Sequence, residues 1–238
     1  MPAFFSALKA RLRLTNLGAR LDWPGDLSDL AAELSWQEGQ LRVETGTARL
    51  KEESLSFSAV VEKPWEENFP LQLQAKTLLS ATELLAKLNP RPVPGLTLFG
   101  PVPLRLNLAG SPKQLQIELA ADLTRVGAAY GGQAEKPMGQ PATLSLQGEI
   151  TPASLRLMAG QLHMPPLDLH LSGSLARQGQ RPLNLELELA PLDLAQCRPQ
   201  VPSLEKLRPE GRIDLRYSRS GRNGKLGKHE GLAGLQRV

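Results

Sequence analysis

Leucine alternates with polar residues from Leu183 to Leu189, where Asn184, Glu186 and Glu188 separate the leucines. Successive side chains of a β-strand point to opposite faces, so this segment has one leucine face and one polar face. In a helix the same leucines would be spread around the cylinder. The segment is therefore predicted to be a strand.

The same alternation recurs along most of the chain, and each run ends at a glycine, a proline or a polar turn. Short strands joined by short connections pair as an antiparallel meander. Because one side of each run is apolar and the other polar, the predicted sheet has one face in water. The runs are Arg11–Leu17, Gln40–Thr45, Ser54–Val60, Pro70–Ala75, Val102–Leu108, Gln114–Leu119, Ala142–Leu146, Ser154–Leu157, Leu167–Leu175, Leu183–Leu189 and Arg212–Tyr217.

Two segments break the alternation. Leu79–Leu88 has apolar residues at helical spacing, with Ser80 at the N-cap position and Glu83 three residues later, as in a capping box. Leu192–Arg198 has a shorter helical pattern and is followed by Pro199. We expect one short helix in each half of the chain.

An internal duplication organises the sequence. Four segments recur in the same order at separations of 109 to 114 residues, which indicates two copies of a unit of roughly 110 residues. The predicted units are residues 1–110 and 111–221. From Ser218 onward glycine and basic residues occur without periodicity, so residues 222–238 are expected to form a disordered basic tail. The matching pairs are Leu14–Ala19 with Leu123–Ala128, Leu41–Gly46 with Leu155–Gly160, Phe69–Leu73 with Arg181–Leu185, and Gly100–Leu104 with Gly211–Leu215.

Composition makes the apolar surface aliphatic. Hydrophobic residues are 41% of the 238 residues, but aromatic residues are only 4%, so large ring anchors are scarce. The single cysteine, Cys197, excludes an intramolecular disulfide and a paired-cysteine metal site. The net charge of +4 is mild, and much of the basic excess lies in the last thirty or so residues.

The sequence has no run of about 18 apolar residues, so no transmembrane helix is predicted. The N-terminus is too short and too charged to be a signal peptide. Phe4, Phe5, Leu8 and Leu12 would form the apolar face of a short interfacial helix. The alternation of Leu12 and Leu14 instead favours the start of a strand.

Common catalytic motifs do not occur, including the Gly-x-Ser-x-Gly elbow, the phosphate-binding loop and the dinucleotide fingerprint. His163 and His170 flank two prolines without an evident third ligand, which favours solvent-facing histidines over a metal site. Asp168, His170 and Ser172 are spaced i, i+2, i+4, as alternation on one strand produces by itself. We predict a protein that is not an enzyme, with no catalytic residue, metal or cofactor.

Charged residues are interpreted as solvated surface. Glu186 and Glu188 share one strand face with other polar residues, so a solvated face is favoured over a catalytic carboxylate pair. The basic residues from Arg212 to Lys228 have only Tyr217 nearby as a stacking ring. This favours a solubilising tail over binding of anionic lipid and, last, of nucleic acid, which is not an expected partner.

The central question is what covers the leucines. Burying one leucine contributes about 1.5–3 kcal/mol, so leaving a row of them in water is not sustainable. Either the two units close on each other as a sandwich or barrel, or an open sheet holds a ligand in a groove. Near-uniform leucine favours a smooth groove over a discrete pocket. The candidate groove residues are Leu71, Leu73, Leu104, Leu106, Leu108, Leu144, Leu146, Leu183, Leu185, Leu187 and Leu189.

From about Ala10 to Gly221 the pattern resembles the AsmA-like and TamB-like bacterial envelope proteins, which contain long series of leucine-alternating strands with turn glycines. Leu123–Ala128 runs into a Lys-Pro-x-Gly-x-Pro-Ala stretch at residues 136–142, which is similar to one in larger AsmA-like members. Leu183–Leu194 runs into Gly211–Gly221 with the same strand pattern. The resemblance implies an elongated, curled antiparallel β-sheet with an open apolar groove, in a protein associated with the inner membrane and located in the periplasm.

The expected function is non-catalytic: binding or conducting phospholipid acyl chains for outer-membrane lipid homeostasis. Expected partners are phospholipids or other acyl chains, and envelope membrane proteins. The alternative is a scaffold that assists outer-membrane protein assembly through open sheet edges, which add strands from a partner. The chain departs from the family because it lacks an N-terminal membrane helix and is shorter than members that bridge two membranes, so we expect a fragment, a split gene product or a truncated relative.

Overall fold

The computed structural model of the protein describes residues 10–19, 27–50, 53–88, 93–132, 134–177, 183–198, 201, 210–222 and 225–236. The chain forms two compact units, and each is described by itself. Unit 1 comprises Met1–Leu78, Pro103–Leu119 and Ile150–Pro152, and unit 2 comprises Leu79–Val102, Ala120–Glu149 and Ala153–Val238.

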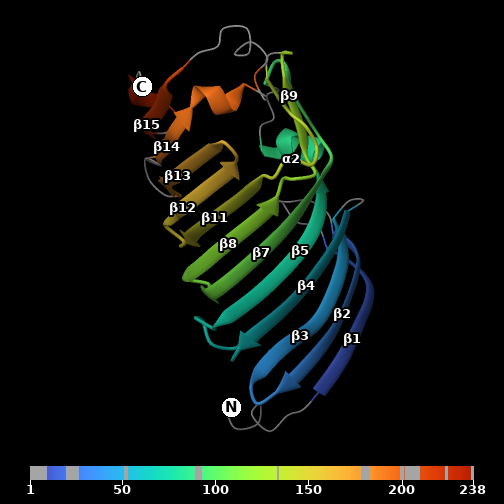
Figure 1. The fold of residues 1–238 in the computed structure, drawn as a ribbon. Coiled ribbons are helices and arrows are strands. Elements are labelled where there is room, and N and C mark those ends of the chain that lie inside the picture. The colour runs from blue at the N-terminus through green and yellow to red at the C-terminus, as the bar shows by residue number, and fades with distance from the viewer. Residues whose placement is uncertain are drawn as a thin grey trace. The chain divides into compact units, whose positions relative to one another are not determined.

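Unit 1 is built mainly from seven strands in the sheet order β1-β2-β3-β4-β5-β7-β8 (Figure 1). β2 and β3 are joined by a two-residue turn in which Glu38 and Gly39 both have positive φ, the geometry that matches the twist of a hairpin. The strands are β1 (Ala10–Ala19), β2 (Leu27–Gln37), β3 (Gln40–Leu50), β4 (Glu53–Glu62), β5 (Leu71–Ser80), β7 (Pro101–Ser111) and β8 (Gln114–Asp122).

Unit 2 contains a larger sheet in the order β11-β12-β13-β14-β15-β16 and a small sheet in the order β10-β9-β6. Its strands are β6 (Leu96–Phe99), β9 (Gly127–Tyr130), β10 (Ala134–Lys136), β11 (Thr143–Ile150), β12 (Ser154–Met164), β13 (Leu167–Ala176), β14 (Leu183–Asp193), β15 (Arg212–Arg222) and β16 (Lys225–Gln236). Helix α2 (Ala81–Leu88) and the single 3₁₀ turn η1 (Leu194–Cys197) complete the unit.

The same succession of elements occurs twice. β3, β4, β5, α2, β7 and β8 are followed later in the chain by β12, β13, β14, η1, β15 and β16, and β6, between α2 and β7, has no counterpart among the described elements of the second copy. A bulge also recurs: the register shifts between Val43 and Gly46 in β3, and between Leu157 and Gly160 in β12. These residues are matched in the duplicated sequence at an offset of 114. The duplication therefore extends to an irregularity within one strand.

A second shared detail joins each helical element to the strand that follows it. Ala81 N donates to Gly100 O at 3.0 Å, and Leu194 N donates to Gly211 O at 3.1 Å. Both glycines have positive φ, at 101° and 122°, a conformation that other residues rarely adopt. Each pair ties the start of a helical turn to the residue just before β7 or β15, so the connecting segment returns to the sheet.

The predicted all-β, antiparallel and open character is confirmed. All strand pairs with a described register are antiparallel, and neither strand order closes into a barrel. The helix predicted at Leu79–Leu88 is α2, and the shorter one at Leu192–Arg198 is η1. The boundaries at residues 1–110 and 111–221 stay a prediction.

The prediction of a disordered tail was wrong for the described residues beyond Ser218. β15 continues to Arg222, and Lys225–Gln236 forms β16, which pairs antiparallel with β15. The open edge of β15 offers unpaired backbone groups, and pairing with them does not require periodic side chains. The predicted apolar face at Phe4, Phe5 and Leu8 lies outside the described residues. Over the described part of the chain, no helix has the length and apolar character needed to span a membrane.

Candidate functional site

The candidate site is the apolar side of strands β12 to β15 in unit 2, here called the leucine face. Partners that lie opposite each other on adjacent strands share a face, so the register aligns their side chains in rows. One row places Leu162, Leu169, Leu189 and Leu215 on four adjacent strands. The next includes Leu171 and Leu187, and the last at one end includes Leu155, Leu175 and Leu183. Of the predicted groove residues, Leu183, Leu185, Leu187 and Leu189 all lie on this face.

The leucine face is not sealed inside the protein. Among the described residues the buried hydrophobic side chains are alanines, valines and Cys197, and no leucine is buried. Leu185, Leu187 and Leu189 are half-buried, and Leu183 is 37% exposed. A closed sandwich or barrel would bury these side chains. The open alternative therefore describes unit 2.

Exposure along the leucine face is graded. Leu155, Leu175 and Leu183, which form one row, are 41%, 38% and 37% exposed. At the other end Met164 and Leu167 are half-buried and line a cavity of about 310 Å³. One end of the face is thus open to water, and the other leads into a partly open apolar hollow.

This cavity, here called the cap hollow, lies between the small sheet and the end of the leucine face. Leu96, Ala128 and Tyr130 line it from the small sheet, and Leu192 and Cys197 line it from β14 and η1. Its volume is at the lower end of the range of about 300–1,000 Å³ that is usual for small-ligand sites. The lining is mostly apolar, so it suits hydrocarbon better than a polar ligand.

Lys136 holds the small sheet in place. It is 8% exposed, and its Nζ donates to Val126 O at 2.7 Å and to Pro137 O at 3.4 Å. Burial lowers the pKa of Lys136, and the negative charge of Asp122 opposes that shift. The side chain is occupied by main-chain carbonyls, so its role is structural.

The Lys-Pro-x-Gly-x-Pro-Ala stretch continues this attachment. Gly139 N donates to Thr124 O at 2.8 Å, and Leu123 N donates to the carbonyl of Ala142, which is buried. Asp122 accepts a hydrogen bond from Thr124 N, and the hydrogen bonds from Thr124 lower the pKa of Asp122. The stretch that carries the family resemblance therefore takes part in hydrogen bonds that hold residues 122–127 against residues 136–142. These hydrogen bonds are here called the loop locks.

Unit 1 has an apolar side of its own. Leu73 continues a row through Ala59 and Val43, and Leu71 continues a row through Val61 and Leu41. Near the Leu71 end the rings of Trp36 and Trp65 lie 5.6 Å apart, centroid to centroid. Leu104 lines a hollow of about 770 Å³, whose wall also includes the ion pair of Arg49 and Asp29. This hollow is more polar than the cap hollow.

The remaining predicted groove residues lie on β7 and β11. Leu106 and Leu108 alternate with the exposed residues Arg105 and Asn107 and are half-buried. Leu144 and Leu146 are likewise half-buried on β11, and a Cβ atom on Gly160 would lie 3.0 Å from Leu146 Cδ2. The bulge glycine of β12 therefore lies directly against a predicted groove leucine.

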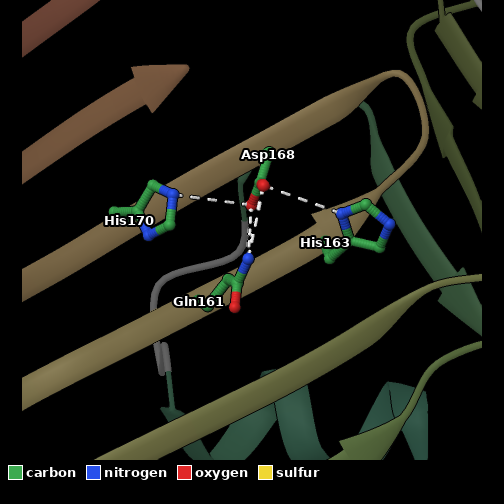
Figure 2. Close-up of polar contacts among 4 residues, drawn as sticks. All are labelled: Gln161, His163, Asp168 and His170. Atoms are coloured by element: carbon green, nitrogen blue, oxygen red, sulfur yellow. Dashed lines mark hydrogen bonds and ion pairs between the residues drawn. The ribbon is translucent and has the colours of Figure 1, made fainter.

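The opposite face of β12 and β13 carries the two histidines. Figure 2 shows His163 and His170 approaching Asp168 from opposite sides, each with a nitrogen 3.8 Å from a different carboxylate oxygen. Gln161 Nε2 donates to Asp168 Oδ1 at 2.9 Å. The histidines do not converge on a common point, and within the described ranges no group of three or more His, Cys, Asp or Glu residues can hold a metal ion. The cluster consists of polar pairs between β12 and β13 and one pair along β13.

Sequence reasoning missed two features of this site. The cap hollow depends on the short strands of the small sheet, which no alternation of apolar and polar residues predicted. Arg219 lies on the leucine face, opposite Leu185. The alternation of Ile213, Leu215 and Tyr217 continues to Arg219, and this phase is the signal that could have identified it.

Comparison with protein-family models, curated proteins and solved structures finds no match for this chain. The resemblance to AsmA-like and TamB-like proteins therefore stays an expectation from the sequence.

Proposed function

We propose that this protein is a non-catalytic envelope protein that binds or conducts phospholipid acyl chains on its leucine face. The observation that carries the proposal is the alignment of leucines across β12 to β15 with no described leucine buried. Large contiguous apolar surfaces on soluble proteins usually mark an interaction site. A hydrocarbon chain can cover such a surface without any polar contact.

The composition of the face favours lipid over a protein partner. The cores of protein interfaces are enriched in aromatic residues, methionine and arginine. At the described positions of the leucine face Tyr217 is the single aromatic residue, and although Met164 and Arg219 are also present, aliphatic leucines supply most of the surface. Each methylene group removed from water contributes about 0.8 kcal/mol, so a bound acyl chain is held by many small, non-specific contributions.

Graded exposure gives the bound lipid a direction. The headgroup stays in water near Leu155, Leu175 and Leu183, and the chain lies along the half-buried rows toward Met164 and Leu167. Because the rows are similar, an acyl chain slides over them with little change in contact. A role in outer-membrane lipid homeostasis, a periplasmic location and envelope membrane proteins as partners follow from the sequence resemblance.

The test is lipid extraction and mass spectrometry of the natively purified protein. The proposal predicts phospholipid at a fixed ratio to protein. Protein free of lipid, with crosslinks at its strand edges, would contradict it and favour the scaffold alternative.

A matched pair of variants locates the lipid. Leu187→Asp adds a charge to the leucine face, whereas Asn184→Asp adds the same charge to the opposite face of the same strand. Leu187→Asp should lose most of the co-purified lipid, and Asn184→Asp should keep it. Equal lipid content in the two variants would exclude this face as the binding surface. Circular dichroism establishes that both variants retain the sheet.

A further inference from the structure

A positive charge is present on the leucine face. Arg219 of β15 lies opposite Leu185 of β14, in the row that continues through Gly173 and Leu157. On the described positions of β12 to β15, the other side chains of this face are aliphatic, methionine, tyrosine or glycine. Arg219 is therefore the single charged residue there.

Arg219 has no partner of its own within the part of the chain that the structure describes. Its side chain is half-buried, its Nε is inaccessible to water, and this nitrogen has no hydrogen-bond acceptor. Arg216, three residues earlier, is on the other face and pairs with Glu188 at 2.9 Å. An unsatisfied buried donor is costly, and more so when it carries charge, so an arginine in this state is suited to an anionic ligand.

The position of Arg219 fits one end of an elongated amphiphile. Its row lies next to the exposed row of Leu155, Leu175 and Leu183. In the other direction, Gly173 lies six residue steps along β13 from Leu167 at the cap hollow. At about 3.3 Å per residue this distance is roughly 20 Å. One acyl layer of a bilayer is comparable, since the hydrocarbon core of both layers is about 30 Å thick.

We propose that Arg219 binds the anionic headgroup, a phosphate or carboxylate, of an amphiphile whose hydrocarbon tail lies along the leucine face toward the cap hollow. This inference rests on the proposed function and adds the ligand class: an amphiphile with an anionic headgroup, held by one arginine, rather than a neutral lipid. Guanidinium suits this role because its planar donors match the oxygens of phosphate and carboxylate. The tail contributes affinity, and Arg219 selects the headgroup and fixes its position.

The test compares three probes on the intact protein by isothermal titration: dodecyl phosphate, dodecyl maltoside with the same tail and a neutral headgroup, and inorganic phosphate. The wild type should bind dodecyl phosphate at least tenfold more tightly than dodecyl maltoside, and should bind inorganic phosphate weakly. Arg219→Gln should remove this tenfold preference while leaving dodecyl maltoside binding unchanged. Arg219→Lys should retain part of the preference.

Arg216→Gln is the matched control, because it removes the same charge from the opposite face of the same strand. It should keep the preference, and an equal loss in Arg216→Gln would overturn the inference by showing a general charge effect. Equal binding of the two dodecyl probes by the wild type would overturn the role of Arg219 but leave the proposed function standing. Binding of neither dodecyl probe would overturn both. Tight binding of inorganic phosphate alone would replace the amphiphile site with a small-anion site.

Discussion

The side chain of Lys136 holds the small sheet in place. Its ammonium group reaches the carbonyls of Val126 and Pro137, and the residue is almost fully buried. The small sheet that lines the cap hollow depends on these contacts, since Lys136 is the last residue of β10 and Val126 immediately precedes β9. The hydrogen bonds of one lysine therefore help to set the shape of the hollow.

Lys136→Met should lower the free energy of unfolding by about 1–3 kcal/mol, because a buried carbonyl loses its donor. Chemical denaturation measures the change. Lys113→Met, which removes an exposed lysine paired with Glu67 at the β7–β8 turn, is the control and should change stability by less than about 0.5 kcal/mol. An equal loss in both variants would contradict the structural role of Lys136.

The pKa shift of Lys136 adds a pH dependence. Burial lowers the pKa in the folded protein, so the unfolded chain binds more protons between that lowered pKa and the ordinary lysine pKa of 10.5. Stability should therefore rise with pH across this window, and the rise should be absent in Lys136→Met. Denaturation at a series of alkaline pH values compares the two proteins. A parallel pH dependence in both would show that Lys136 does not cause it.

Gly46 and Phe57 provide a test of the duplication at the level of single residues. A Cβ atom on Gly46 would overlap the Phe57 ring, which lies opposite it. In the second copy the corresponding pair is Gly160 and Leu171, where the equivalent approach is 3.2 Å to Leu171 Cβ. The smaller leucine thus relieves much of the crowding over the bulge.

Gly46→Ala should destabilise the protein by about 1–3 kcal/mol through overpacking. The cost should be smaller in a Phe57→Leu background, which copies the second repeat. A double-mutant cycle in chemical denaturation measures this coupling. Additive effects of the two substitutions would mean that the ring does not restrict this position.

At the scale of elements, each helical segment is linked by a hydrogen bond to the residue just before the next strand. This link, here called the joint, recurs in both copies. The joint consists of a first-turn N–H bonded to a positive-φ glycine just before the next strand, as in Ala81 with Gly100 and Leu194 with Gly211. The first copy has the two-turn helix α2, and the second has only η1. η1 places Cys197 in the wall of the cap hollow.

Cys197 is a natural reporter of the cap hollow. Burial, followed by the nearby Asp193 charge, raises the pKa of its thiol, and only the thiolate reacts readily. Cys197 should therefore react slowly with an aromatic disulfide reagent at neutral pH, and at least threefold more slowly with saturating dodecyl phosphate. Because the chain has one cysteine, the absorbance change reports this site alone. An unchanged rate with bound amphiphile would exclude its tail from the cap hollow.

The sequence was a good guide to regular strands and a poor one to irregular ones. β13 keeps the alternation along its length and β14 keeps it from Leu183 to Leu189, so the faces of these residues follow from period two, whereas β14 continues to Asp193 beyond the predicted run after a register shift. β2 was missed because its register shifts at two places, which breaks the alternation of Leu27–Gln37. β6, β9 and β10 are too short to show a period, and their pairing depends on the loop locks of residues 122–142.

The candidate site was predictable to the same extent. Alternation identified the leucine face on β14, because the side-chain direction is a local property. The cap hollow and the buried state of Lys136 depend on contacts between segments far apart in the chain, which no local pattern records. Arg219 was assigned to a basic tail because the glycines after it obscured the strand, although its phase matches that of Leu215 and Tyr217.

At the scale of the whole molecule, the proposed lipid binding depends on an apolar surface that the described part of the protein does not cover. Photocrosslinking with a phospholipid that carries a diazirine in its acyl chain tests this most directly, with the attachment sites mapped by peptide mass spectrometry. The account predicts crosslinks at leucine-face residues such as Leu169 and Leu187, and none at His170 or Glu188 on the opposite side of the same strands. Crosslinks spread equally over both faces, or absent from the leucine face, would contradict it.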